Sequence, residues 1–97
     1  MLSENTIVVA GKEQIATEMG DDVVILGLKT GAYYGLSEVG ASIWKAIQQP
    51  ISISQIREVI MDEYEIDADQ CTQDILALLE RLSAEGLVDV QNNEAGA

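Results

Sequence analysis

The sequence contains no histidine and only one cysteine, Cys71, among its 97 residues. Histidine is the most common general base and a frequent metal ligand, and a Ser/His or Cys/His nucleophile pair is impossible without it. A single thiol forms neither an internal disulfide nor a redox pair, and no glycine-rich loop followed by Lys and Ser/Thr is present to hold phosphate. These absences predict a protein with no catalytic residues, no metal site and no cofactor.

Basic residues are scarce, since five Lys and Arg stand against 17 Asp and Glu and give a net charge of −12. Nucleic-acid binding depends on neutralising phosphates, and the five basic residues are scattered, so the composition argues against a nucleic-acid partner. The acidity has two open interpretations. It provides solubility, or it attracts a basic peptide or protein, because opposite charges speed encounter.

Long apolar runs are also missing: none approaches the roughly 20 residues of a membrane helix, and the N-terminus lacks the features of a signal peptide. We therefore expect a cytoplasmic location and no membrane partner. Hydrophobic residues make up 47% of the chain, enough for the core of one domain over residues 1–97. We expect residues 6–90 to be its ordered part and the polar residues 91–97 to be frayed.

Short apolar runs and alternation predict strands in the N-terminal third of the chain. Gly and Asp at residues 20–22 and Gly31 predict the turns between them. Alternation in the last of these strands places Tyr34 toward the core and Tyr33 on the outer face. The expected strands are residues 14–19, 23–26 and 32–36, with a further strand or extended arm at residues 6–9.

From Ser37 onward, apolar residues recur every three or four positions, which predicts three helices. Ser37 is the expected N-cap of the first, which reaches about Gln48. A capping box at residues 52–55 and a similar one at residues 67–70 begin the other two. Gly86 ends the third helix, and residues 87–90 pack back as a short strand or extended segment. The expected core stripe of that helix is Cys71, Ile75, Leu78 and Leu82, with Leu79 at its shoulder.

Together these elements predict an α+β, winged-helix-like fold, in which an N-terminal three-stranded antiparallel sheet is followed by a three-helix bundle. With its residues in this order, the chain resembles the PqqD family of peptide-recognition domains, which serve enzymes that modify ribosomally made peptides (RiPPs). The matching segments are the hairpin Val23–Leu36, the junction Ser37–Trp44, and the later segments Asp74–Leu82 and Gly86–Val88. Tyr-Tyr-Gly-Leu followed by Ile-Trp is most similar to the stand-alone leader-binding proteins of lasso-peptide biosynthesis.

The resemblance implies that the leader of a precursor peptide binds as an added strand beside the third helix. It also implies delivery of the precursor to a separate leader peptidase or other maturation enzyme. A free strand edge is compatible with a monomer or with an edge-paired or swapped dimer. Leu76 has a second interpretation, as an ordinary exposed leucine. The implied peptide-binding residues are Ala32, Tyr33, Tyr34, Gly35, Asp69, Gln73, Asp74, Leu76 and Ala77.

Three other functions remain open from the sequence. The first alternative, within the same family, is a peptide chaperone for a radical SAM enzyme in quinone cofactor synthesis. A winged-helix transcription regulator is a second alternative, which the net charge of −12 disfavours. An acidic carrier protein is a third, but it needs an attachment serine in an Asp-Ser-Leu context, and Ser37 follows leucine and precedes glutamate.

Overall fold

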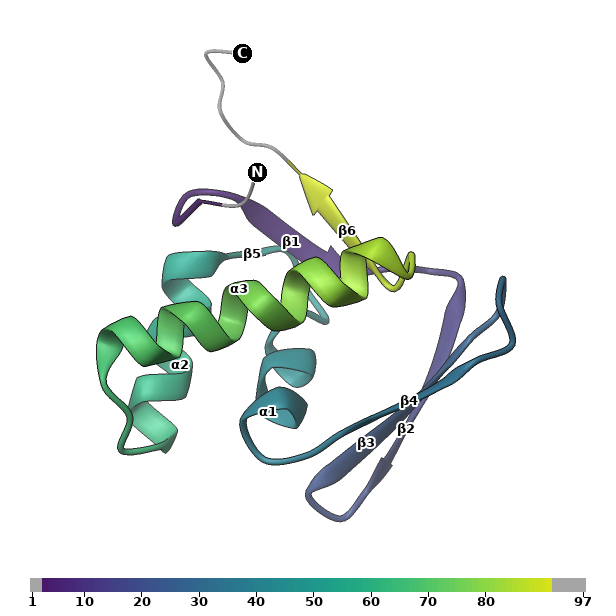
Figure 1. Cartoon of the computed structure of the whole chain (residues 1–97), viewed down its shortest axis with the longest axis horizontal. Coiled ribbons are helices and arrows are strands. Elements are labelled where there is room, and N and C mark those ends of the chain that lie inside the picture. Colours follow the sequence, from purple (N-terminus) through teal and green to yellow (C-terminus); the bar gives the residue numbers. More distant parts are fainter. Residues whose placement is uncertain (1–2, 92–97) are drawn as a thin grey trace.

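The computed structural model describes residues 3–91, which form two three-stranded antiparallel sheets and three helices (Figure 1). One sheet has the strand order β5 (Ile51–Ser52), β1 (Ile7–Ala10), β6 (Val88–Gln91). The other has the order β2 (Gln14–Met19), β3 (Asp22–Gly27), β4 (Tyr33–Leu36). The helices are α1 (Val39–Ala46), α2 (Ile53–Glu63) and α3 (Ala68–Ala84). None of these three helices is long and apolar enough to cross a bilayer.

The mixed α+β class is confirmed, but the expected order of one sheet followed by a helix bundle is wrong. β1 pairs with β6 and with β5, which lies between α1 and α2, so both ends of the described chain meet in one sheet. Val8 of β1 is fully buried in this arrangement. Gln91 lies in β6 rather than in a frayed tail, and the rest of the expected tail lies outside the described residues.

The second sheet follows the sequence pattern closely. Gly20 and Gly31 have φ angles of 68° and 71°, the left-handed region in which glycine has no steric penalty, and each lies in the turn after a strand. In β3, Val23 and Ile25 are buried while Val24 and Leu26 are half-buried. The sheet therefore has one face on the core and one face toward solvent.

The start of α1 differs from the expectation, because Ser37 is not its N-cap. Glu38 occupies that position with φ 51° and ψ −121°, and its side chain makes no capping hydrogen bond. The buried Leu36 ends β4 only two residues earlier, so the chain must turn sharply to enter the helix. The Gly40 N–H donates to the Ser37 carbonyl at 3.0 Å within this tight connection.

The other helix ends agree better with the sequence. The Ser52 side chain accepts from the Gln55 N–H and the Gln55 side chain accepts from the Ser52 N–H, so the capping box is complete. At α3 only half of the box forms, because Asp67 caps the Gln70 N–H while the Gln70 amide donates to Asp74. Gly86, with φ 75°, ends α3 as expected.

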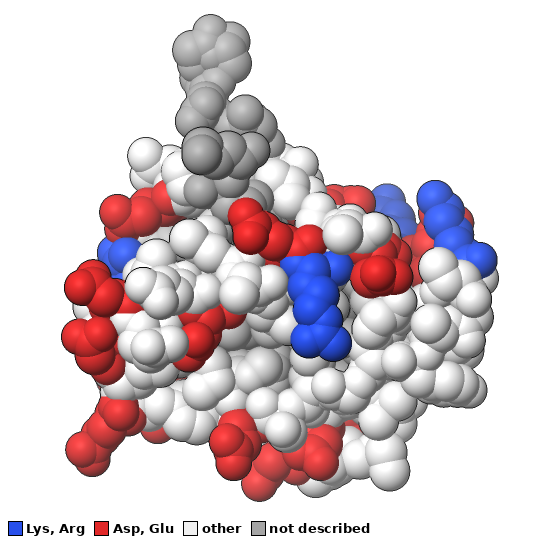
Figure 2. Space-filling model, viewed as in Figure 1, with Lys and Arg blue, Asp and Glu red and all other residues white. Residues whose placement is uncertain are grey.

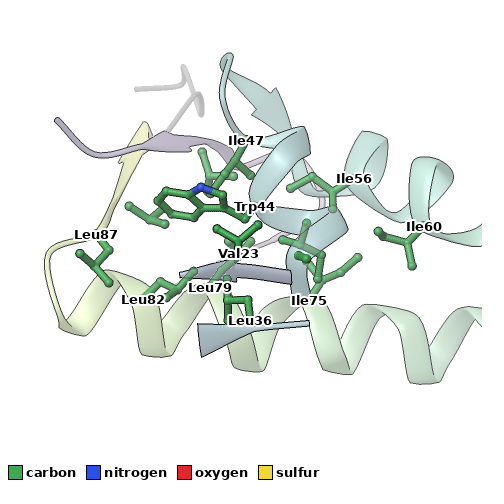
Figure 3. Close-up of a cluster of buried hydrophobic side chains, with 14 of the residues drawn as sticks. Val23, Leu36, Trp44, Ile47, Ile56, Ile60, Ile75, Leu79, Leu82 and Leu87 are labelled. Carbon is green, nitrogen blue, oxygen red and sulfur yellow. The ribbon is translucent and has the colours of Figure 1, made fainter. Parts of the chain in front are cut away.

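One hydrophobic core lies between the three helices and the inner faces of the two sheets, and it is almost entirely aliphatic apart from Trp44 (Figure 3). The expected stripe of α3 is rotated: Leu79 is fully buried, whereas Leu78 is only partly buried. In α2, Val59 is 38% exposed, although it precedes the buried Ile60 and lies three residues after the buried Ile56. Each helix has packing partners on two sides, since α2 contacts α1 and α3 while α3 contacts α2 and β6, so packing as well as the apolar stripe sets the rotation.

The rotation of α3 can be tested by truncating its two neighbouring leucines. Leu79→Ala is expected to lower the free energy of unfolding by about 2–5 kcal/mol, because it leaves a cavity in a fully buried site. Leu78→Ala is expected to cost clearly less, since part of this side chain is already in contact with solvent. Urea denaturation of both variants measures the difference, and equal losses would contradict the assigned rotation.

Candidate functional site

One long edge of β4 has no strand partner among residues 3–91, since β4 pairs only with β3. The Gly27 N–H donates to the Ala32 carbonyl at 2.9 Å, which shows which residue pairs of β3 and β4 are hydrogen-bonded. Because hydrogen-bonded and non-bonded pairs alternate in an antiparallel ladder, Tyr34 and Leu36 direct their main-chain groups toward β3. Tyr33 and Gly35 therefore present two N–H groups and two carbonyls at the free edge.

The side chains of β4 alternate as the sequence predicted. Tyr33 is 71% exposed on the outer face, while Tyr34 is half-buried and Leu36 is buried on the core side. On the outer face, Tyr33 lies in register with Leu26 of β3, which in turn lies opposite Ile15 of β2. This row gives the second sheet an apolar, partly exposed outer face.

Gly35 has no steric reason to be glycine within the described chain. A Cβ at this position would meet no atom within 4 Å, and its φ is not positive. Glycine inside a strand weakens it and often marks a place where another backbone or a ligand comes close. The outer face of the sheet is therefore open above Gly35.

The C-terminal half of α3 lies beside β4. The Tyr34 hydroxyl donates to the Glu85 carboxylate at 2.6 Å, just after the end of the helix. Leu36 and Leu78 both come within 4 Å of the Cβ position of Gly40, so the end of β4 lies near the middle of α3. β4 and α3 therefore run in opposite directions, as Figure 1 also shows.

These contacts define the flank of α3 that faces β4. A helix has 3.6 residues per turn, so side chains at certain positions point in nearly the same direction around its axis. Within about 60° of one another lie the directions of Asp74, Leu78, Arg81 and, continued past the helix end, Glu85. We call Asp74, Leu78 and Arg81 the β4-facing flank. Two of its members, Leu78 and Arg81, were not among the site residues that the sequence suggested.

The other predicted α3 residues lie elsewhere around the helix. The Arg57 guanidinium of α2 donates to the Thr72 hydroxyl at 3.2 Å, which places the Thr72 flank, including the partly buried Leu76, against α2. The remaining three residues, which are exposed and directed away from the core, are Asp69, Gln73 and Ala77. Ala77 borders the β4-facing flank. Of this group, only Asp74 lies on the flank of α3 that faces β4, beyond the Leu36 end of the strand. The predicted residues Tyr33, Tyr34 and Gly35 lie in β4, and Ala32 immediately precedes it.

Two other positions offer less for chemistry. Burial raises the pKa of the Cys71 thiol and the nearby Asp74 carboxylate raises it further, so the group is a protonated core side chain. Between α1 and α2 lies an open depression of about 530 Å³ lined by residues such as Lys45, Ile51 and Val59. No group of three or more His, Cys, Asp or Glu in residues 3–91 is arranged to hold a metal ion.

The fold and site together define a small α+β domain with an unpaired strand edge next to a helix. Residues 22–88 match the family model described as coenzyme PQQ synthesis protein D (PqqD), and the chain belongs to the PqqD family, as the sequence indicated. No curated protein sequence matches the chain.

Two solved structures are similar to the chain over most of its length. "TbiB1 in Complex with the TbiA(beta) Leader Peptide" has a TM-score of 0.78 and 28% identity, covering 84% of this chain and 94% of the other. "Lasso peptide synthetase B1 complexed with the leader peptide" has a TM-score of 0.74 over 84% of this chain and 96% of the other. With 22% identity, the second likeness concerns the fold alone.

The Tyr34–Glu85 link has a measurable electrostatic signature. The hydrogen bond to Glu85 raises the pKa of Tyr34 and lost solvation adds to the rise, whereas the Thr30 side chain and, to a smaller extent, the Arg81 charge oppose it. A raised pKa in the folded state means that the link contributes stability below the ordinary tyrosine pKa of about 10. This contribution is lost as the pH rises through the higher folded value.

We expect Glu85→Gln to lower the pKa of Tyr34 toward its ordinary value, because a neutral amide no longer resists formation of a phenolate. Titration of the Tyr34 ring by NMR measures the change. Glu80→Gln is the matched control, since Glu80 is exposed on the same helix and points away from β4. An equal shift in both variants would show that the Tyr34 pKa responds to overall charge and not to the link.

Proposed function

We propose that this protein binds the leader region of a ribosomally made precursor peptide and presents it to a separate leader peptidase or other maturation enzyme in lasso-peptide biosynthesis. The observation that carries the proposal is the unpaired edge of β4 beside α3. Membership of the PqqD family supports it, and so does the likeness to TbiB1, whose structure holds a leader peptide.

Strand addition explains how such a peptide binds. An extended segment laid along β4 satisfies the main-chain groups of Tyr33 and Gly35, which supplies affinity with little demand on sequence. Its side chains alternate: one set points with Tyr34 toward α3, and the other points outward beside Tyr33. Apolar leader side chains on the inner set contact Leu78, and outward ones extend over the open space at Gly35.

Around this edge, the side chains suit binding rather than covalent chemistry. They are tyrosines, a leucine, an arginine and carboxylates. The one hydroxyl that meets a carboxylate, that of Tyr34, has a raised pKa, which is the opposite of an activated nucleophile. The protein then acts as a non-catalytic adaptor, and cleavage of the leader belongs to its partner enzyme.

A second function is favoured by the description of the family model, which names coenzyme PQQ synthesis. A peptide chaperone for a radical SAM enzyme would use the same β4 edge, so the geometry is shared by both functions. The genes beside this one separate them. A short precursor, a peptidase and an asparagine-synthetase-like cyclase indicate lasso-peptide biosynthesis, whereas a radical SAM enzyme indicates the chaperone.

A proline substitution tests strand addition directly. Gly35→Pro removes an N–H that faces the free edge and leaves pairing with β3 intact, because that N–H does not bond to β3. The fluorescein-labelled leader of the precursor encoded beside this gene serves as the probe. Fluorescence anisotropy is expected to show binding weakened at least about tenfold, the equivalent of about 1.4 kcal/mol.

Ala16→Pro is the matched control on the opposite edge of the same sheet. The Leu28 N–H donates to the Glu13 carbonyl at 3.0 Å, so alternation directs the Ala16 N–H away from β3 as well. This variant is expected to bind the leader as the unsubstituted protein does. Equal effects of the two prolines, or no binding of the leader to the unsubstituted protein, would refute the proposal.

A further inference from the structure

The β4-facing flank carries opposite charges at its two ends. Asp74 and Arg81 are seven residues apart, which corresponds to about 10 Å along the helix axis, and Leu78 lies between them. Because β4 and α3 run in opposite directions, Arg81 lies at the Tyr34 end of the free edge and Asp74 at the Leu36 end. The order along the edge is thus positive, apolar, negative.

Arg81 is an unusual charge for its surroundings. It is the only basic residue of α3 in a protein of net charge −12. Three other basic residues, Lys29, Lys45 and Arg57, each lie within 4 Å of a glutamate carboxylate, but Arg81 forms no such ion pair within residues 3–91. Figure 2 shows a blue patch over the C-terminal half of α3, with red patches around it.

The neighbours of Arg81 do not neutralise it at close range. Glu85 is one turn further along and accepts the hydrogen bond from Tyr34 instead. At the other end of the flank, the half-buried Asp74 accepts from the Gln70 amide, which is neutral and leaves the carboxylate charge in place. Both charges are therefore available to a peptide lying between β4 and α3.

We propose that this flank reads charge along the bound leader and thereby fixes its direction and register on β4. The inner face of the leader then carries an acidic side chain beside Arg81, an apolar one at Leu78, and a basic one toward Asp74. Same-face residues of an extended chain recur about every 6.7 Å, so three of them in this order place the acidic and basic positions four residues, or about 13 Å, apart in the leader. The length of the Arg81 side chain covers the difference from the roughly 10 Å between the two helix positions. The inference rests on the proposed function, since it concerns the same edge.

Charge contacts with α3 would add to the specificity of strand addition, because main-chain pairing alone fixes the register of the leader weakly. Main-chain pairing along a short strand is nearly the same after a two-residue slip, because the side-chain period is two. A reversed peptide places like charges together, and a two-residue slip moves each charged side chain of the leader away from its partner on the flank, so charges at both ends disfavour both alternatives. The flank therefore acts on register, which the main-chain bonds alone specify weakly.

Charge reversal on both partners provides the test. The labelled leader is made as two series, with Glu or Lys at each position in turn, and each peptide is titrated against the unsubstituted protein and against Arg81→Glu. We expect one leader position at which Glu binds better than Lys, and at which Arg81→Glu reverses the preference by about tenfold or more. The reversal is expected to shrink in high salt, because the pair is solvent-exposed.

Lys12→Glu is the control for net charge, because Lys12 is exposed, lies outside the site and changes the total charge by the same amount. It is expected to leave the positional preference unchanged. If Arg81→Glu weakens all peptides uniformly, or leaves the profile of the unsubstituted protein unaltered, the charge-reading proposal is wrong while leader binding stands. If the unsubstituted protein binds no peptide of either series, the proposed function itself fails.

Discussion

The antiparallel pairing of β1 with β6 is the constraint on which the site depends. β6 follows α3 directly, so its ladder with β1 holds the C-terminal end of the helix in place. The connection is reinforced where the Gly11 N–H donates to the Leu87 carbonyl at 2.8 Å. Leu87 itself is buried, which ties the helix end to the core. α3 is thereby kept beside β4 rather than over it, and the edge of β4 stays open.

The same constraint explains which parts of the fold the sequence predicts. The turn at Gly31, the alternation of Tyr33 and Tyr34 and the Ser52 capping box depend on a few neighbouring residues, and all three agree with the structure. The division into two sheets depends on a partner for β1 from the other end of the chain. No local pattern encodes that partner, because a β-branched run such as residues 7–9 pairs equally well with a neighbour in sequence.

Some residues of the candidate site are likewise predictable from local sequence, and others are not. The β4 residues follow from the two-residue period of a strand, which leaves only two possible faces. The helix residues require the rotation of α3, and a helix with apolar residues on a broad face is compatible with several rotations. Leu78 has the spacing of a core residue, so its place at the edge of β4 is evident only from contacts made by Leu36 and Gly40. Arg81, four residues before Glu85, becomes noticeable only once Tyr34 is seen to reach Glu85.

An open strand edge also exposes a protein to pairing with copies of itself, and natural proteins counter this hazard with charge. Here the net charge of −12 opposes the approach of a second copy along either edge of the sheet. The acidity that first indicated either solubility or a basic partner therefore has a structural consequence. It disfavours pairing of the β4 edge with a second copy of the chain, and the proposed leader binding needs that edge to be free.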